Sequence, residues 1–331
     1  HVDTVKALSA ALDLSDATRD ALFASGRAAT HTAVFDDRSG GLLPLALTAL
    51  LGRDDDVKLL REWLADPALR LVTLTGPGGA GKTRLAQEVG RAVMLEGGAR
   101  VVFVPLAAVR DASFVAAAIA EALGLLDISA LDLAKRVRAA CDGRRTLLFL
   151  DNFEHVLDAA PLVSELLTSV AALRVLVTSR AALRVRGERE YVVGPLALNV
   201  AEDASPDDMA RSPAVRLFME RVRDVRPEFR LTPSNGPIVT AICRRLDALP
   251  LALELAAPWL KLLTPEDLWR RLAQDVLFST SGPRDLPERQ QTMNETIAWS
   301  YRLLDQNEQR VFRRLAVLSG DFPIEAAAAV V

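Results

Sequence analysis

Cysteine, aromatic residues and long apolar runs are all scarce in this 331-residue sequence. The two cysteines, Cys141 and Cys243, belong to no CxxC pair and have no nearby pair of histidines. This excludes a disulfide framework and a zinc site of the usual spacing, and we expect both thiols to be buried and reduced. No apolar run is long enough to span a bilayer and no signal peptide is visible, so we expect a cytoplasmic protein without a membrane partner.

Neither sign of charge dominates the sequence. Lys and Arg total 40 and Asp and Glu total 43, which gives a formal net charge of −3. Nucleic-acid binding needs clustered cations, so this balance argues against a DNA-binding surface within the sequence itself. Half of the residues are hydrophobic, and the length predicts two or three domains with sizeable cores. The first residue is His1 rather than Met, so we expect a part of a longer protein.

Strand-like runs alternate with helical patterns in the first two thirds of the chain. The strand-like runs lie at Leu71–Thr75, Val101–Val104, Thr146–Leu150, Leu173–Thr178 and Glu190–Val193. The helical patterns lie near residues 54–65, 82–95, 112–124, 130–141 and 156–170. Such alternation predicts right-handed βαβ units, a parallel sheet and the α/β fold class.

The rest of the sequence is predicted to be helical, with two linkers. Short helices are expected within 1–29, and residues 212–276 look wholly helical, with Pro250 at the start of a helix. Glycine and proline mark linkers at 31–44 and Ser281–Pro287. A capping box, Asp305–Glu308, predicts a helix over Gln309–Leu318.

A glycine-rich motif follows the first predicted strand. The pattern GxxxxGK[ST] occurs once, at Gly76, Pro77, Gly78, Gly79, Ala80, Gly81, Lys82 and Thr83. A strand precedes it and a helix follows it, as a phosphate-binding loop requires. In such a loop Lys82 bridges the β- and γ-phosphates and the Thr83 hydroxyl ligates Mg²⁺. The motif predicts binding of ATP with Mg²⁺; GTP is disfavoured because no [NT]KxD motif occurs. We count the next residue, Arg84, among the nucleotide-binding residues.

Two further residues are expected beside these phosphates. Asp151 follows the run Thr146–Leu150, and a carboxylate at the C-terminal tip of a parallel strand can hold Mg²⁺ through water. The alternative for Asp151 is a helix N-cap. Arg180 follows the run Leu173–Thr178 and is expected to reach the γ-phosphate, the alternative being an ordinary surface arginine.

The general base for hydrolysis is less clearly marked. Asn152 stands where an acid would be convenient for orienting water, and Glu154 and His155 are the nearest titratable residues. Both can instead cap or flank the next helix. Our hypothesis is that hydrolysis is slow, with Glu154 as the candidate base. A fast single-turnover step that Glu154→Gln abolishes would overturn slow hydrolysis and establish Glu154 as the base.

Together these motifs resemble the STAND class of P-loop ATPases, specifically the NB-ARC module of bacterial regulators, over about residues 45–331. Gly76–Thr83 is similar to the Walker A motif of that family and Leu147–Asp151 to its Walker B motif. Thr178–Arg180 resembles the family's sensor motif, in which the arginine reads the γ-phosphate.

Two more motifs carry the resemblance. Leu51-Gly52-Arg53 resembles the entry motif, which implies that Gly52 and Arg53 contact adenine. Leu249–Ala252 is similar to the motif that places a proline, here Pro250, against the nucleotide. Asn152 departs from the second acid of many relatives, although a bacterial subgroup also carries Asn. The chain ends before a full winged helix, so the histidine that some relatives place against the ADP phosphate is not located.

The resemblance implies a division of the chain into five parts. These are the tail of a repressor-like helix-turn-helix domain (1–30), a linker (31–44), a P-loop NTPase core (45–198), a helical subdomain (199–281) and a partial winged-helix subdomain (282–331).

The implied function is a nucleotide switch with slow ATP hydrolysis. ADP would lock the subdomains together, and exchange for ATP would change the contacts of Arg180 and permit self-association. In the longer protein the output would be transcription, with DNA bound through regions outside this sequence and an unknown signal sensed through C-terminal repeats. The alternative is an AAA-type ATPase motor with steady turnover. A small-molecule kinase is disfavoured because no acceptor-activating Asp motif occurs.

Overall fold

The computed structural model describes residues 43–96, 99–125, 133–141, 143–201, 204–273, 301, 306–317 and 323–330. All of these described residues belong to the second of the two units into which the chain divides, Gly41–Val331. The predictions for the N-terminal helices, for most of the first linker and for the linker Ser281–Pro287 lie outside the described residues.

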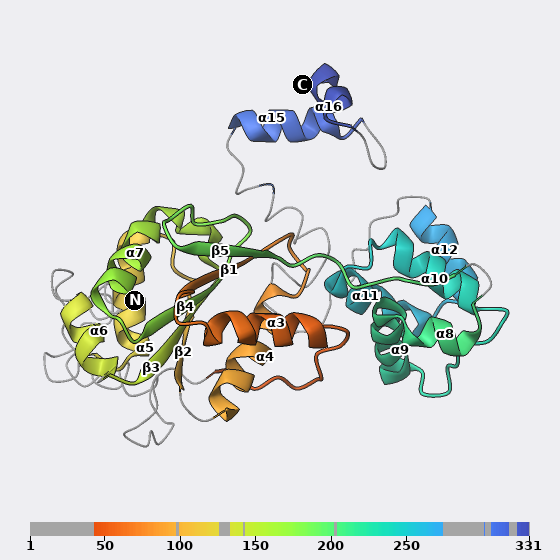
Figure 1. Cartoon of the computed structure of the whole chain (residues 1–331). Coiled ribbons are helices and arrows are strands. Elements are labelled where there is room, and N and C mark those ends of the chain that lie inside the picture. Colours follow the sequence, from red (N-terminus) through yellow and green to blue (C-terminus); the bar gives the residue numbers. More distant parts are fainter. Residues whose placement is uncertain are drawn as a thin grey trace, which may run out of the picture. The chain divides into compact units, whose positions relative to one another are not determined.

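Five parallel strands form one sheet, as the sequence predicts. They are β1 (Leu71–Thr75), β2 (Ala99–Pro105), β3 (Arg145–Asp151), β4 (Leu173–Thr178) and β5 (Glu188–Val192). Their spatial order is β2-β3-β4-β1-β5, and every neighbouring pair is parallel (Figure 1). Because β4 lies between β1 and β3, the C-terminal ends of these three strands are adjacent at one edge of the sheet.

Helices cover both faces of this sheet. The helices are α3 (Asp54–Ala65), α4 (Lys82–Leu95), α5 (Val115–Ala122), α6 (Leu133–Cys141) and α7 (Ala160–Ser169). On β3, Leu147 and Phe149 belong to the core shared with α3 and α4, whereas Leu148 and Leu150 belong to the core shared with α5, α6 and α7. Successive strand residues point to opposite faces, so the continuous apolar run on β3 serves two cores.

The region after the sheet is helical and has a core of its own. Its helices are α8 (Pro206–Arg211), α9 (Pro213–Val225), α10 (Gly236–Arg245), α11 (Pro250–Ala256) and α12 (Pro265–Ala273). Phe218, Ile242 and Leu253 are fully buried in this core. Most of these helices begin with proline, whose missing N–H costs nothing at the first helical position. The prediction that 212–276 is wholly helical needs correction within the described residues 212–273, because short helices are separated by turns, including residues 226–235, and the helical region begins earlier, at α8.

Several predicted boundaries need correction. The pattern near 112–124 divides into a 3₁₀ turn, η1 (Ala112–Phe114), and α5. The pattern near 156–170 divides into η4 (Leu157–Ala159) and α7. The prediction of a helix over Gln309–Leu318 was wrong in both ends, because α15 spans Gln306–Leu315, with α16 (Ile324–Val330) after it. In a capping box the glutamate is already the third helical residue, so Glu308 belongs inside the helix.

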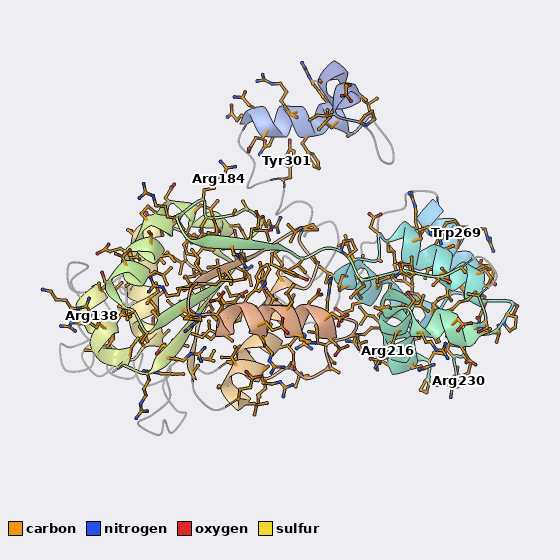
Figure 2. The ribbon with its side chains drawn as sticks, viewed as in Figure 1. Arg138, Arg184, Arg216, Arg230, Trp269 and Tyr301 are labelled. Carbon is orange, nitrogen blue, oxygen red and sulfur yellow. The ribbon has the colours of Figure 1, made fainter. Side chains whose placement is uncertain are left out.

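Arginines near the start of strands and the end of helices donate to helix C-termini. Arg70, before β1, donates to the carbonyl oxygen of Leu167 at 2.8 Å. Arg138, at the end of α6, donates through Nε to the carbonyl oxygen of Ser169 at 2.9 Å and lies at the surface (Figure 2). The last carbonyls of a helix lack intrahelical donors and carry partial negative charge, which a guanidinium satisfies. These contacts fix the helices against the sheet.

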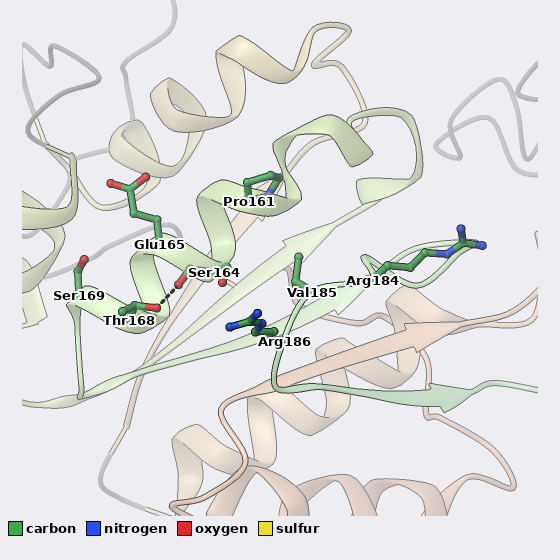
Figure 3. Close-up of a pocket in the computed structure, with 8 residues that line it drawn as sticks. All are labelled: Pro161, Ser164, Glu165, Thr168, Ser169, Arg184, Val185 and Arg186. Carbon is green, nitrogen blue, oxygen red and sulfur yellow. Dashed lines mark hydrogen bonds between the residues drawn. The ribbon is translucent and has the colours of Figure 1, made fainter.

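A surface groove of about 580 Å³ lies beside α7 (Figure 3). It is lined by residues of α7 and of the loop that leads to β5, namely Pro161, Ser164, Glu165, Thr168, Ser169, Arg184, Val185 and Arg186. None of the residues predicted to bind nucleotide lines this groove. This groove is therefore not the predicted nucleotide-binding site.

Two further expectations concern the cysteines and the membrane. Cys141 and Cys243 are both buried, as predicted. Burial raises the pKa of Cys243 to about 12, which keeps the thiol protonated and unreactive. In the described part of the chain no helix has both the length and the apolar character needed to cross a bilayer.

Candidate functional site

The loop between β1 and α4 has the backbone geometry of a phosphate-binding loop. Gly76, Gly79 and Gly81 have φ angles of 137°, 83° and 92°. A Cβ at Gly76 would also lie 2.5 Å from the carbonyl oxygen of Val193. L-residues with side chains rarely adopt positive φ, whereas glycine does so at little cost. The spacing of the glycines in the motif is thus explained by the backbone that the loop must adopt.

The N-terminus of α4 faces this loop. The helix begins at Lys82, its N-cap Gly81 has left-handed geometry, and no side chain caps its first turn. The first N–H groups of a helix have no intrahelical acceptor, and they carry partial positive charge. An anion such as a phosphate group can satisfy them.

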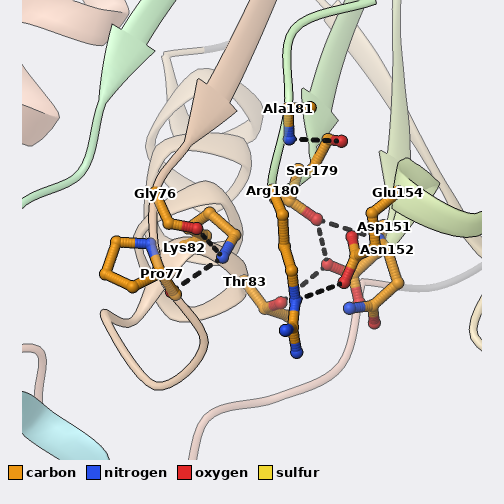
Figure 4. Close-up of polar contacts among 11 residues, drawn as sticks. Gly76, Pro77, Lys82, Thr83, Asp151, Asn152, Glu154, Ser179, Arg180 and Ala181 are labelled. Atoms are coloured by element: carbon orange, nitrogen blue, oxygen red, sulfur yellow. Dashed lines mark hydrogen bonds and ion pairs between the residues drawn. The ribbon is translucent and has the colours of Figure 1, made fainter. Parts of the chain in front are cut away.

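Lys82 is nearly buried, with 9% of its surface exposed. Its Nζ donates to the carbonyl oxygens of Gly76 at 2.8 Å and Pro77 at 3.0 Å (Figure 4). Burial lowers the pKa of Lys82 to about 8, against the opposing influence of the Glu154 carboxylate; Arg180 lowers it further and Asp151 raises it. The loop carbonyls therefore hold the ammonium group where charged phosphate oxygens would be stronger partners.

Asp151, the last residue of β3, connects the loop to β4 through two hydroxyl groups. Its Oδ1 accepts a hydrogen bond from Thr83 Oγ1 at 2.7 Å and another from Thr178 Oγ1 at 2.6 Å (Figure 4). The N-cap position of the following 3₁₀ turn, η3 (Phe153–His155), is Asn152. The alternative of Asp151 as a helix N-cap therefore does not hold.

The oxygen atoms of Thr83 and Asp151 fit the requirements of Mg²⁺. Thr83 donates its hydroxyl proton to Asp151, so the lone pairs of its oxygen remain for a cation. Mg²⁺ prefers hard oxygen ligands and keeps several waters, so one or two protein groups are enough when phosphates supply the others. Within the described ranges there is no group of three or more His, Cys, Asp or Glu residues that could hold a metal.

A tight turn after β3 directs Glu154 toward the same edge of the sheet. Asn152 has a φ of 64°, in the left-handed region that Asn tolerates better than most residues. Its N–H donates to Thr178 Oγ1 at 2.9 Å. Phe153 is fully buried, and Nε2 of His155 lies 2.8 Å from the carbonyl oxygen of Leu106. Glu154 is therefore held between two anchored residues.

Glu154 forms an ion pair with Arg180. Glu154 Oε1 lies 3.4 Å from Arg180 Nε, and the two side chains are 6% and 20% exposed (Figure 4). The low exposure shows that Arg180 is not an ordinary surface arginine. Both residues also influence the pKa of Lys82. The structure therefore brings the predicted sensor, the candidate base and the P-loop lysine together at one edge of the sheet.

The residues assigned to adenine contact make contacts within the protein. Gly52 has a φ of 64°, and a Cβ there would lie 2.3 Å from the Cβ of Pro213. The guanidinium of Arg53 forms an ion pair with Asp56 at 3.1 Å and donates to the carbonyl oxygens of Gly194 and Ala80. Arg53 thus joins α3, the P-loop and the segment after β5. Arg84, on α4, donates to Thr48.

Pro250 and Leu251, at the start of α11, pack on the phosphate-binding loop. The Leu251 N–H donates to the carbonyl oxygen of Gly79 at 3.2 Å. The Cγ of Pro250 lies 3.9 Å from the position of a Cβ at Gly81, and a Cβ at Gly79 would lie 2.9 Å from Leu251 Cβ. The helical region therefore contacts the P-loop directly, through the proline that the sequence motif singled out.

Two contributors were not among the predicted site residues. Thr178 was noted only as part of the sensor motif, yet its hydroxyl bonds both Asp151 and the Asn152 N–H. Leu251 was noted only as the neighbour of Pro250. Thr178 could have been identified because it is a threonine at the end of a strand adjacent to the P-loop strand. The backbone hydrogen bond of Leu251 could not, because backbone hydrogen bonds leave no signal in a sequence.

Comparison with known protein families places this site in context. Residues 69–185 match a family model described as AAA domain. The matched stretch includes β1, the P-loop, Asp151, Glu154 and Arg180. The chain therefore carries an AAA-type P-loop ATPase domain.

Curated mycobacterial proteins match a larger part of the chain. "Uncharacterized protein Rv0894" of Mycobacterium tuberculosis is 35% identical over 285 residues, which cover 86% of this chain and 69% of that protein. The chain belongs to the family of Rv0894. "Putative HTH-type transcriptional regulator Rv0890c" of the same organism is 39% identical over 262 residues, which cover 79% of this chain. The chain spans only 28% of the length of Rv0890c.

Two solved structures are similar to this chain at low sequence identity and low TM-score. The Aeropyrum pernix ORC1 protein in complex with DNA is 18% identical, with a TM-score of 0.42, over 87% of this chain and 83% of that chain. A Signal Transduction ATPase with Numerous Domains (STAND) protein with a tetratricopeptide repeat sensor, PH0952 from Pyrococcus horikoshii, is 17% identical. Its TM-score is 0.40, over 89% of this chain and 38% of that chain. The likeness concerns the fold alone.

Proposed function

We propose that this AAA-type domain is an ATP/ADP-binding switch of the STAND class, with Mg²⁺ as the metal and slow ATP hydrolysis. Lys82 and the N–H groups of the P-loop hold the phosphates, and Thr83 and Asp151 hold the metal. The state of the bound nucleotide, rather than repeated turnover, carries the signal.

The observation that carries this proposal is the hydrogen bond from the Leu251 N–H to the carbonyl oxygen of Gly79, at 3.2 Å. Gly79 belongs to the loop that surrounds the phosphates, and Leu251 belongs to a helix with a separate hydrophobic core. A change at the phosphates therefore has a short physical path to the helical region. Coupling of this kind requires contacts that differ between two nucleotide states.

The catalytic edge of the site supports slow hydrolysis. The residue after Asp151 is Asn152, which cannot act as a base. The nearest carboxylate, Glu154, is already engaged with Arg180 at 3.4 Å. A general base must be free to accept a proton from water, and a carboxylate held by a guanidinium is less available for that role.

The role in the longer protein is also part of the proposal. Rv0890c is named as an HTH-type transcriptional regulator, which supports an output in transcription. DNA would be bound by regions outside this sequence, and the signal would be sensed by C-terminal repeats. Exchange of ADP for ATP would release the helical and winged-helix subdomains from the core and permit self-association.

The second candidate is an AAA-type motor with steady turnover, which the AAA domain match supports equally. The two differ in what the purified protein holds. Purify the protein without added nucleotide, denature it, and identify the released nucleotide by chromatography; then measure steady-state ATP hydrolysis. About one ADP per chain together with little turnover is the result expected of a switch. No retained nucleotide and sustained turnover by an assembled ring would replace the switch by the motor.

A further inference from the structure

Glu154 is a buried carboxylate whose contacts are incomplete. Its side chain is 6% exposed, and Oε1 is 3.4 Å from Arg180 Nε. The other oxygen, Oε2, is buried and has no hydrogen-bond partner among the described residues. The contact to Arg180 is longer than the 2.7–2.9 Å typical of a charge-assisted hydrogen bond. Charge is therefore the main attraction between the two side chains, and Arg180 can exchange Glu154 for a stronger partner.

The ion pair and Lys82 lie at the same edge of the sheet (Figure 4). The charges of Glu154, Arg180 and Asp151 all influence the pKa of Lys82, with Glu154 the strongest of the three. Lys82 is the residue that reaches the β- and γ-phosphates in P-loop proteins. A third phosphate would thus bring negative charge close to Glu154, and Arg180 would lie within its field.

We propose that Glu154 is the counter-ion that retains Arg180 and opposes the γ-phosphate, and so sets the preference of this site for ADP over ATP. This role deepens the proposed switch and rests on it. Glu154 acts through Arg180 and through its own charge, so it is a positioning and specificity-determining residue rather than a general base.

Two physical effects act in the same direction. The carboxylate repels the added charge of a third phosphate. In addition, Arg180 can approach the γ-phosphate only by weakening its contact with Glu154, which would leave a buried carboxylate without a partner. ADP has no third phosphate, so the repulsion is weaker and Arg180 can keep its contact with Glu154. Binding of ATP therefore carries a cost that binding of ADP does not.

The anchored turn explains why Glu154 cannot simply move away. Asn152 and His155, on either side of it, are tied to Thr178 and to the carbonyl oxygen of Leu106, and Phe153 is fully buried. The backbone that carries the carboxylate is thus fixed. Arg180, on a longer side chain beyond the end of β4, is the partner that changes position.

The test compares the dissociation constants of Mg-ADP and of a non-hydrolysable Mg-ATP analogue. Glu154→Gln keeps the shape of the side chain and removes its charge. We expect the ratio of the two constants to shift on the order of tenfold toward the triphosphate. Glu121→Gln, on the exposed side of α5, is the matched control and should leave the ratio unchanged.

A second pair of variants separates the proposed role from a purely structural one. Arg180→Gln alone should weaken the triphosphate selectively, because it removes the cation that reads the γ-phosphate. In that background Glu154→Gln should shift the ratio less than it does in the parent, since only the direct repulsion remains. If Glu154→Gln does not fold, Glu154→Asp retains the charge, lengthens the contact, and should give a smaller shift in the same direction.

The outcomes separate the two proposals. A parent protein that binds neither nucleotide rejects the proposed function itself. A parent that binds both, with a ratio unmoved by Glu154→Gln, leaves the switch intact and overturns the role of Glu154. Loss of single-turnover hydrolysis in Glu154→Gln without a change in the ratio would overturn it as well, and would make Glu154 the base.

Discussion

At the scale of single residues, the buried ammonium group of Lys82 links nucleotide binding to pH. Burial lowers its pKa to about 8 in the free protein. Phosphate groups favour the charged form and must raise this pKa. We therefore expect Lys82 to be partly deprotonated near pH 8 in the free protein and protonated in the complex, so that binding near this pH takes up a fraction of a proton.

This uptake is measurable by calorimetry. The enthalpy of Mg-ADP binding at pH 8 should differ between buffers with different ionisation enthalpies, and the difference should shrink at pH 7. The affinity should fall as the pH rises above 8, by up to about tenfold per unit, because the free protein loses the charge that the phosphates need. An enthalpy at pH 8 that is independent of the buffer would show that Lys82 does not change its protonation.

Thr178 provides a second prediction at this scale. Its hydroxyl donates to Asp151 and accepts from the Asn152 N–H. Thr178→Val would leave both groups short of a partner, and we expect a loss of about 1–3 kcal/mol in the free energy of unfolding. Mg²⁺-dependent nucleotide affinity should fall as well, because Asp151 loses a contact that orients it.

A matched control for Thr178 lies in the same sheet. Thr73, on β1, is fully buried, and its Oγ1 has no hydrogen-bond partner among the described residues. Thr73→Val should therefore be neutral or stabilising in chemical denaturation. Equal losses for the two variants would mean that packing, and not the hydrogen bonds of Thr178, explains the effect.

The same residues show what the sequence could and could not predict about the site. The P-loop motif and Asp151 were identifiable because each follows an apolar strand directly. The ion pair of Glu154 with Arg180 was not, because it depends on β4 lying between β1 and β3. That order arises from packing between elements far apart in the sequence, and no local pattern encodes it.

At the scale of elements, every strand of the sheet and the helices that cover it were predicted, with several ends displaced by two to four residues, since periodicity and apolar runs are local properties. Short 3₁₀ turns such as η1 and the turns between α9, α10 and α11 were missed, because they continue the composition of their neighbours. The start of α15 was misplaced because the glutamate of the capping box was counted outside the helix.

The contact of Gly52 with Pro213 gives a prediction at this scale. Gly52 has a positive φ and no room for a side chain, with a Cβ only 2.3 Å from Pro213 Cβ. Gly52→Ala combines backbone strain with overlap, and we expect a loss of about 2–5 kcal/mol in the free energy of unfolding. Weaker contact between α3 and α9 should accompany it.

A variant at Gly124 measures the cost of backbone strain without the cost of steric overlap. It also has a positive φ, of 73°, but a Cβ there would meet nothing within 4 Å. Gly124→Ala should therefore cost only the backbone strain, about 1–2 kcal/mol. If denaturation gives the same value for Gly52→Ala and Gly124→Ala, the close approach of Pro213 to Gly52 has no energetic weight.

At the scale of the whole molecule, the described structure joins a sheet-containing core to a helical core, and the phosphate-binding loop touches both. The Leu251 N–H bonds the loop directly, and Arg53 bonds the loop and the segment after β5. The loop is therefore in direct contact with both regions, as the proposed switch requires. The proposed switch depends on nucleotide binding at this loop.

Calorimetry tests nucleotide binding at the P-loop most directly. The dissociation constants of Mg-ADP and Mg-ATP are measured for the parent, Lys82→Ala and Lys58→Ala. Lys58 is an exposed lysine on α3 and serves as the matched control. Lys58→Ala should bind each nucleotide as tightly as the parent does. Lys82→Ala should bind each nucleotide at least about 100-fold more weakly, because a buried charge-assisted contact to the phosphates is lost. Binding by Lys82→Ala as tight as that of the parent would contradict the account.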